Sequence, residues 1–259
     1  MNITIINDCR DANAVGRQTA RVATLTGFPV SFIGVKSDLE AAGNLIDIID
    51  ALEESTGAIL VNVAPRNGKA KKWKNGTPFG YFRYKNILVL TSIDGFTLSL
   101  VKKLKLIESI TILDIPKALD QMISGGVLSK EIKDLVTRTQ FRSYDFLPRV
   151  ATYLLSGKNL EGAKMSIKDV PDAPAVVWWV DNFGNCKTTF LNEDRKDGIS
   201  FYSKFSNLPY FERLKDVPDD TASIVSGSSG IGKKRFLEII IQGKSAANEF
   251  NVFTGDAVA

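Results

Sequence analysis

The chain has 259 residues, of which 44% are hydrophobic and 24% are charged, the balance of a soluble globular protein rather than a disordered one. The formal net charge of +4 is small for this length, and the basic residues form only one short run, at 69–74, so we expect no nucleic-acid partner. The sequence contains no histidine, which excludes Ser-His-Asp and Cys-His catalysis and histidine-bound metals.

The two cysteines and the apolar segments indicate the compartment. Cys9 and Cys186 lie far apart and form no CxxC pair, which argues against a disulfide framework or a zinc site and fits a reducing environment. The N-terminus has no charged segment followed by an apolar one, so no signal peptide is expected. No apolar stretch approaches the roughly 18 residues that a membrane helix needs. We therefore expect a cytoplasmic protein with no metal and no membrane partner.

Strand-like and helix-like segments alternate in the first half of the chain. In chain order we expect strands at 3–6, 30–35, 58–63, 87–90 and 109–113, and helices at 14–25, at 39–52 and from Asp94-Gly95 to about residue 104. This alternation is typical of a doubly wound, Rossmann-like parallel sheet, whose ligands bind at the carboxyl ends of the strands. By that rule Asp8, Asn67 and the neighbourhood of Asp94 converge on one crevice.

The pattern changes after Phe146-Leu147-Pro148 and a helix expected at 149–155. Residues 171–174 resemble a linker, and strand-like runs without intervening helices follow at 175–180, 199–202, 224–225 and 236–241. We therefore predict an N-terminal α/β domain at 1–160 and a separate C-terminal β domain at 170–259.

Residues 227–234 (GSSGIGKK) nearly match the phosphate-binding loop GxxxxGK[ST]. Lys234 stands where a magnesium-binding hydroxyl is required, and the next run, 236–241, is strand-like rather than helical, so we do not predict a nucleoside-triphosphatase. Two interpretations stay open. The segment is a plain surface loop, or a flexible loop that presents the hydroxyls of Ser228 or Ser229 to an anion such as a carboxylate.

The segment Asp181-Asn-Phe-Gly-Asn185 ends an apolar strand. Asn and Gly favour a turn, and a turn alone would explain them. The functional interpretation is that Asp181 and Asn185 direct a carboxylate and an amide toward an amino-acid-like ligand.

Several separate blocks resemble the S-adenosylmethionine hydroxide adenosyltransferases and the related fluorinase and chlorinase. The similar blocks, in order and over nearly the whole chain, are Asp8 with Val15-Gly16 (TDFG…YVG), 64–68 (DPGVG), 141–145 (FHGRD), 181–189 (DxFGN..TN) and 236–247 with Gly255-Asp256 (GFLEIAVNGGSAAE…GD). The blocks at 181–189 and 236–247 are the most specific.

The resemblance implies an N-terminal α/β domain, a C-terminal β-barrel and a homotrimer with each site at a subunit boundary. The substrate would be S-adenosylmethionine, with no further cofactor. Asp8 would bind its ribose. Asn67, which the strand-end rule places in the same crevice, is also predicted to bind the substrate. Asp181, Asn185 and a serine of the 226–229 segment would meet its methionine end, and Gln242 with the following turn would lie near adenine.

The reaction centre departs from the family. Where the hydroxide-using members carry an Asp-Arg-His set, this chain has Ala64, Lys71 (or Lys72) and Arg142, and Ser143 coincides with the serine beside the halide in the fluorinase. The carboxylate that would orient water is absent and two cations remain. These cations can hold hydroxide or a halide by charge and lower the pKa of bound water.

The chemistry needs no histidine, because the sulfonium makes methionine a good neutral leaving group and the enzyme has only to place a desolvated nucleophile in line with ribose C5′. We therefore predict an S-adenosylmethionine hydrolase that forms adenosine and methionine, with catalytic Lys71, Arg142 and Ser143. The alternatives are a catalytically silent protein that binds S-adenosylmethionine or adenosine, and an enzyme that uses a halide as the nucleophile.

Overall fold

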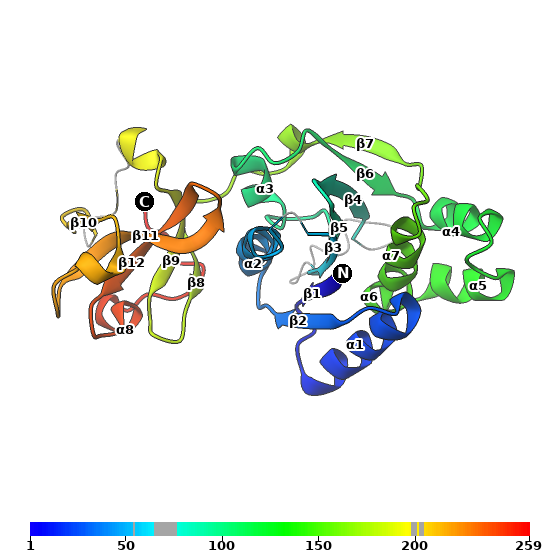
Figure 1. The fold of residues 1–259 in the computed structure, drawn as a ribbon, viewed down its shortest axis with the longest axis horizontal. Coiled ribbons are helices and arrows are strands. Elements are labelled where there is room, and N and C mark those ends of the chain that lie inside the picture. The colour runs from blue at the N-terminus through cyan, green and yellow to red at the C-terminus, as the bar shows by residue number, and fades with distance from the viewer. Residues whose placement is uncertain (54, 65–76, 198–200, 202–204) are drawn as a thin grey trace. The chain divides into compact units, whose positions relative to one another are not determined.

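The computed structural model describes residues 1–53, 55–64, 77–197, 201 and 205–259 (Figure 1). The chain divides into two compact units, Met1–Pro171 and Asp172–Ala259, called the N-terminal and C-terminal units below. The N-terminal unit combines a seven-stranded mixed sheet with helices, and the C-terminal unit is built mainly on a five-stranded mixed sheet, so the chain has a mixed α/β fold.

The sheet of the N-terminal unit has the strand order β2-β1-β3-β5-β4-β6-β7. Its strands are β1 (Asn2–Asn7), β2 (Val30–Gly34), β3 (Gly57–Asn62), β4 (Phe79–Tyr84), β5 (Ile87–Ser92), β6 (Ser109–Leu113) and β7 (Ala163–Ser166). Strands β2, β1, β3 and β5 are parallel, whereas β4 pairs antiparallel with β5 and β6, and β6 pairs antiparallel with β7. The expected strand 109–113 is present as β6 and runs in the same direction as β5, but it does not pair with a parallel neighbour, because the unpredicted β4 lies between them and is antiparallel to both.

Helices cover both faces of this sheet. They are α1 (Ala12–Thr26), α2 (Asp38–Ala51), α3 (Ser99–Lys103), α4 (Ile115–Ser124), α5 (Lys130–Arg138), α6 (Arg142–Asp145) and α7 (Leu147–Leu155). Figure 1 shows α2 and α3 on one side of the strands and α7 on the other, and α1 packs against α7. The helices expected at 14–25, 39–52 and 149–155 are confirmed as α1, α2 and α7, while α4 and α5 were not predicted.

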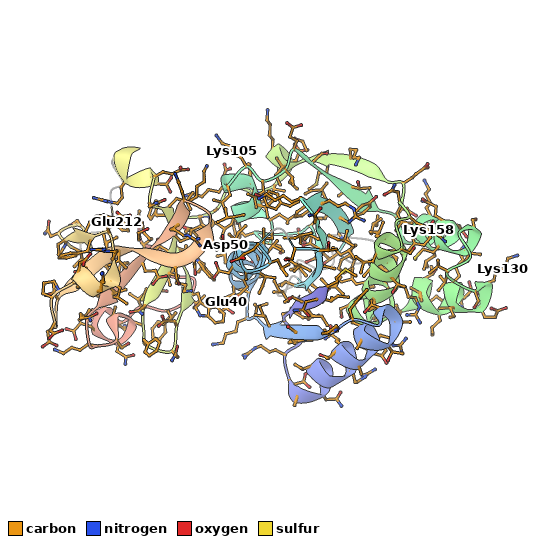
Figure 2. The ribbon with its side chains drawn as sticks, in the orientation of Figure 1. Glu40, Asp50, Lys105, Lys130, Lys158 and Glu212 are labelled. Carbon is orange, nitrogen blue, oxygen red and sulfur yellow. The ribbon has the colours of Figure 1, made fainter. Side chains whose placement is uncertain are left out.

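Local sequence signals set the ends of the first two helices. The carboxylate of Asp11 accepts hydrogen bonds from two backbone amides of the first turn of α1, and Gly27 ends that helix with a φ of 72°. The Ser37 hydroxyl accepts from the Glu40 amide at the start of α2. The Glu40 carboxylate (Figure 2) accepts from the Lys36 amide at 2.7 Å, so the two side chains bind amides in the manner of a capping box.

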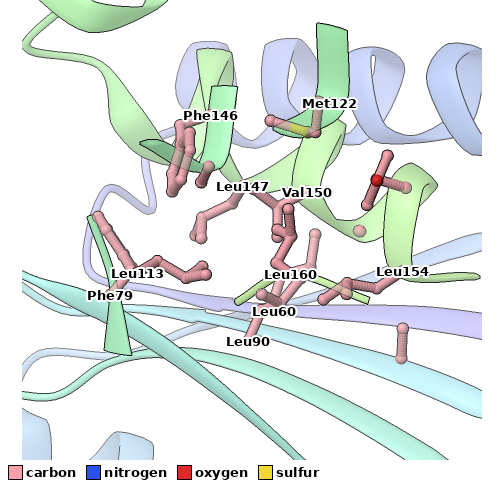
Figure 3. Packing of buried hydrophobic residues seen from close by; sticks show 14 of the residues in the cluster. Leu60, Phe79, Leu90, Leu113, Met122, Phe146, Leu147, Val150, Leu154 and Leu160 are labelled. Carbon is pink, nitrogen blue, oxygen red and sulfur yellow. The ribbon is translucent and has the colours of Figure 1, made fainter. Parts of the chain in front are cut away.

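The main core of the N-terminal unit lies between the sheet and the helices on the α7 side. Alternate residues of β1, β3 and β5 point into it, which is why these strands carry apolar residues on that face. Figure 3 shows the packing of Leu60, Leu90, Phe146, Val150 and Leu154. The helices on this side are therefore fixed to the sheet by burial of apolar surface.

The C-terminal sheet has the order β10-β11-β12-β9-β8. Its strands are β8 (Val177–Val180), β9 (Cys186–Leu191), β10 (Tyr210–Phe211), β11 (Ala222–Ile231) and β12 (Lys234–Ile241), and the short α8 (Ala246–Phe250) follows. Strands β8 and β10 stand at the two edges of this sheet among the described residues, so its closure into a barrel stays a prediction. The strand expected at 199–202 falls, apart from Phe201, outside the described residues.

The segment 227–234 is a β-hairpin and not the loop that the sequence suggested. Strand β11 continues to Ile231 through a bulge between Ser226 and Gly230, and β12 begins at Lys234. A strand in place of a helix after the glycines agrees with the argument against a phosphate-binding loop.

Candidate functional site

The strand order of the N-terminal unit reverses at β1. From β1 the chain passes through α1 to β2 on one side, and then through α2 to β3 on the other side of β1. In open α/β sheets, ligands bind outside the carboxyl ends of the strands at such a switch point. The carboxyl ends of β1 and β3 are therefore the candidate site that the topology itself indicates.

Asp8 lies at this point, one residue beyond β1. Its Oδ2 accepts a hydrogen bond from the amide of Ala64 at 3.2 Å, and its own amide donates to the carbonyl of Asn62 at 3.3 Å. The half-buried carboxylate thus joins the chain leaving β1 to the chain leaving β3. A carboxylate held here can accept hydrogen bonds from the hydroxyl groups of a sugar.

A buried amide pair supports this edge of the sheet. The Asn7 side chain is fully buried, and its Nδ2 donates to Oε1 of Gln18 on α1 at 2.7 Å, while its Oδ1 accepts from the Cys9 amide at 2.8 Å. Asn62 Nδ2 lies 3.5 Å from the same Oδ1. The sequence analysis missed Asn7, Asn62 and Gln18 as site residues, although an Asn at the end of each of two apolar strands was a usable signal.

Arg142 and Ser143 form the start of α6, which packs against α1 and α7. Burial lowers the pKa of the half-buried Arg142 guanidinium from its ordinary value. Within the described part of the chain, this guanidinium has no hydrogen-bond or ion-pair partner, and the nearby Asp145 carboxylate instead accepts from the Thr139 hydroxyl at 2.7 Å. Arg142 is therefore a cation that can accept an anionic partner.

Two of the predicted residues cannot be placed. Asn67 and Lys71 lie in the segment 65–76, outside the described residues, as does Lys72. Ala64, the last described residue before this segment, is exposed and uses its amide to bind Asp8.

In the C-terminal unit, Asp181 and Asn185 close a turn. Asp181 Oδ1 accepts from the amides of Phe183 and Asn185, each at 2.9 Å, and Oδ2 accepts from Asn185 Nδ2 at 2.9 Å. The carboxylate is thus engaged within the turn, as the structural interpretation of this segment required. Phe183 is 71% exposed at the tip and presents an aromatic face that the sequence analysis did not select.

The turn packs on the segment that begins α8. The Gly184 carbonyl accepts from the Ala247 amide at 2.9 Å, and a Cβ on Gly184 would stand 2.0 Å from the Ser245 hydroxyl. Gly184 also has a φ of 84°, so both the backbone and the contact require glycine. The two most specific blocks of the resemblance, 181–189 and 236–247, are therefore in direct contact.

The remaining predicted residues are on β11 or just after β12. Ser229 is 3% exposed, and its hydroxyl accepts from Lys187 Nζ at 2.5 Å, so this residue lies in a bulged strand and not in the flexible loop that the sequence suggested. Ser228 is exposed, on the same bulged strand. The backbone of Gln242 pairs with Asp220 and Thr221.

Two solved structures resemble this chain in fold. No protein-family model and no curated protein matches the chain. A crystal structure described as an uncharacterized conserved protein from Thermotoga maritima has a TM-score of 0.69 and 16% sequence identity, over 98% of this chain and 97% of that one. A structure described as a conserved hypothetical protein from Thermus thermophilus has a TM-score of 0.52 and 15% identity, with the same coverage of 98% and 97%. At such identities the likeness shows the fold alone.

Among the described residues, no helix is both long enough and apolar enough to cross a bilayer.

Proposed function

We propose that this protein binds S-adenosylmethionine and transfers its adenosyl group to water, which yields adenosine and methionine. The observation that carries the proposal is the position of Asp8 at the switch point between β1 and β3, where a carboxylate can accept hydrogen bonds from the hydroxyl groups of a ribose. The order of sequence blocks that resemble the S-adenosylmethionine hydroxide adenosyltransferases supports the choice of substrate.

The reaction balances without a metal or a histidine. The oxygen of water forms a bond to ribose C5′, the bond from C5′ to sulfur breaks, and its electron pair remains on sulfur, so neutral methionine thioether leaves. The proton of the attacking water passes to solvent. The protein has to align the nucleophile and remove its water shell.

Among the described residues, Arg142 is the one that we propose binds the nucleophile. A guanidinium without a carboxylate partner can stabilise hydroxide and thereby lower the pKa of a bound water. Lys71 and Ser143 are proposed to assist it. A halide held by the same cations would instead give the 5′-halogenated nucleoside.

The second candidate is a protein that binds S-adenosylmethionine or adenosine without reaction. The exposed Ala64, which contributes only its backbone amide to Asp8, favours it, because a carboxylate at that position would be needed to orient water. The finer architecture (a doubly wound N-terminal unit and a C-terminal barrel), the trimer and the roles of Asp181, Asn185, Ser228, Ser229 and Gln242 also remain parts of the proposal.

Incubation with S-adenosylmethionine, with and without halide, followed by chromatography of nucleosides, tests the reaction. We expect adenosine and an equal amount of methionine. Asp8→Asn should weaken adenosine binding by roughly tenfold, because a charge-assisted hydrogen bond to ribose becomes a neutral one. The matched control is Asp120→Asn, an exposed carboxylate paired with Lys133 in the same unit, which should bind normally.

The outcomes separate the candidates. Binding that depends on Asp8 without product formation would favour the silent protein. If neither S-adenosylmethionine nor adenosine bound, or if both Asp variants bound alike, the assignment of the site would be wrong.

A further inference from the structure

Two arginines of α1 lie over the ring of one tyrosine of α6, and an arginine of α7 lies nearby. The guanidinium carbons of Arg17 and Arg21 lie 4.8 and 4.2 Å from the centre of the Tyr144 ring, and Arg21 Nη2 donates to the Tyr144 hydroxyl at 2.7 Å. Arg149 of α7 donates to the backbone carbonyl of Asp145, the residue that follows Tyr144, at 2.6 Å, and the charges of Arg21 and Tyr144 act on its pKa. Helices α1, α6 and α7 thus bring these side chains together.

The positive charge of this cluster is poorly compensated. Neither Arg17 nor Arg21 has a carboxylate partner within the described ranges of the chain, and α1 itself contains no acidic residue. The Asp145 carboxylate, which attracts Arg149, already accepts from Thr139. Arg149 donates to the backbone carbonyl of Asp145 at 2.6 Å, a neutral acceptor.

We infer that Arg17, Arg21 and Arg149 form a binding site for the phosphate group of a small phosphorylated molecule. Guanidinium groups bind phosphate oxygens through paired N–H donors, and a doubly charged anion matches several cations better than a single carboxylate does. The Tyr144 ring holds two of the guanidinium groups in place before a ligand arrives, which reduces the entropy lost on binding.

The pKa shifts in the cluster are those expected where positive charges lie together without a bound anion. Burial, followed by the charge of Arg21, lowers the pKa of Arg149. The hydrogen bond from Arg21 lowers the pKa of the Tyr144 phenol. An anion bound between the arginines would relieve the repulsion between them.

This site differs from the one proposed for S-adenosylmethionine, which carries no phosphate group. The Arg195–Tyr210 pair of the C-terminal unit provides a matched control. Arg195 also lies over a tyrosine ring, at 3.2 Å, but the Tyr210 hydroxyl donates to the Glu212 carboxylate at 2.6 Å. Its surface pocket contains two carboxylates, from Glu193 and Glu212.

The test is a thermal-unfolding titration with inorganic phosphate and with adenosine 5′-monophosphate, against sodium chloride at equal ionic strength. A ligand that binds the native state raises the unfolding midpoint. We expect both phosphate compounds to raise it above the chloride control, and a larger effect of one identifies free phosphate or a phosphate ester as the better ligand. Arg17→Gln, at an exposed position that tolerates the change, should weaken the response by roughly tenfold.

The Arg195→Gln control should leave the response unchanged. As a second readout, phosphate should raise the pKa of the Tyr144 phenol, measured as the difference in phenolate absorbance between the parent protein and Tyr144→Phe. An unfolding midpoint no higher in phosphate than in chloride would overturn the inference, as would an Arg17→Gln response equal to that of the parent protein.

Discussion

Each unit contains an arginine stacked on a tyrosine, yet the two tyrosines differ in what binds their hydroxyls. In the N-terminal unit the Tyr144 hydroxyl accepts from Arg21, and in the C-terminal unit the Tyr210 hydroxyl donates to Glu212. The hydrogen bond from Arg21 lowers the pKa of Tyr144. Burial, followed by the hydrogen bond to Glu212, raises the pKa of Tyr210.

The difference shows that the stacking contact alone does not define a site. Around Tyr210 a carboxylate accompanies the cation, and the cluster is an exposed structural contact of small net charge. Around Tyr144 three cations share one partly engaged carboxylate, Asp145. Charge balance around an aromatic ring thus distinguishes a candidate anion site from a surface contact.

The largest expected effect is on stability. Tyr144→Ala should lower the free energy of unfolding by about 2 kcal/mol, since a half-buried ring is removed and the arginines lose the surface that separates them. Tyr210→Ala should cost about 1 kcal/mol, because Arg195 and Glu212 become free to pair directly. Urea unfolding of both variants measures the difference, and a greater loss in Tyr210→Ala would contradict this account.

Much of the fold follows from local sequence. The strands at 2–7, 57–62 and 87–92 lie where apolar runs end in polar residues, and the capped helices α1 and α2 lie within two residues of their expected ends. The placement of β4 did not follow, because its antiparallel pairing with both β5 and β6 depends on contacts between distant segments. Its aromatic run and the turn at Lys85, with a φ of 51°, were local signals of a hairpin.

The site was accessible to sequence reasoning only in part. Asp8 follows from the rule that ligands bind at strand ends, and the turn role of Asp181 was one of the two interpretations of that segment. The Tyr144 cluster was not predictable, because Arg21 and Tyr144 are separated by 123 positions and no short motif joins them. The contact arises only when α1, α6 and α7 pack together.

A smaller effect is expected in the titration of the two phenols. The charged groups that act on Tyr144 are Arg21 and Arg17 from α1, and the Tyr144 phenol in turn acts on Arg149 of α7. Phenolate absorbance should develop at lower pH in the parent protein than in Tyr144→Phe, whereas Tyr210→Phe should remove a component that ionises above the ordinary pKa of a phenol. Arg21→Gln should raise the pKa of Tyr144, and Glu212→Gln should lower that of Tyr210.

The same shifts determine how stability depends on pH. The folded pKa of Tyr144 lies below the unfolded value of about 10, so its contribution is present above that value and is lost as the pH falls through the folded pKa. The folded pKa of Tyr210 lies above it, so its contribution is present below about 10 and is lost as the pH rises through the folded pKa. As the pH rises from neutral to alkaline, the unfolding free energy of Tyr144→Phe should therefore fall relative to that of the parent protein, and that of Tyr210→Phe should rise relative to it.

The smallest expected effect is the response to sodium chloride. Arg17 and Arg21 repel each other, because both guanidinium groups lie over the Tyr144 ring, 4.8 and 4.2 Å from its centre. The Debye length falls from about 10 Å at 0.1 M salt to about 3 Å at 1 M. High salt should therefore raise the unfolding free energy of the parent protein relative to that of Arg17→Gln. The expected change is about 0.3 kcal/mol, a magnitude typical of exposed charges. The cation–π contact of Arg17 with the Tyr144 ring changes little with salt. The dependence of this free-energy difference on salt concentration therefore measures the repulsion between the arginines.

Arg195 is the control for that measurement. It shares its surface pocket with two carboxylates and two lysines, so the attractive and repulsive terms that salt would screen nearly cancel. The difference in unfolding free energy between the parent protein and Arg195→Gln should therefore be the same at low and high salt. Equal slopes for the two variants would mean that the Tyr144 cluster carries no excess positive charge in solution, and the contrast between the two tyrosines would then lie in hydrogen bonding alone.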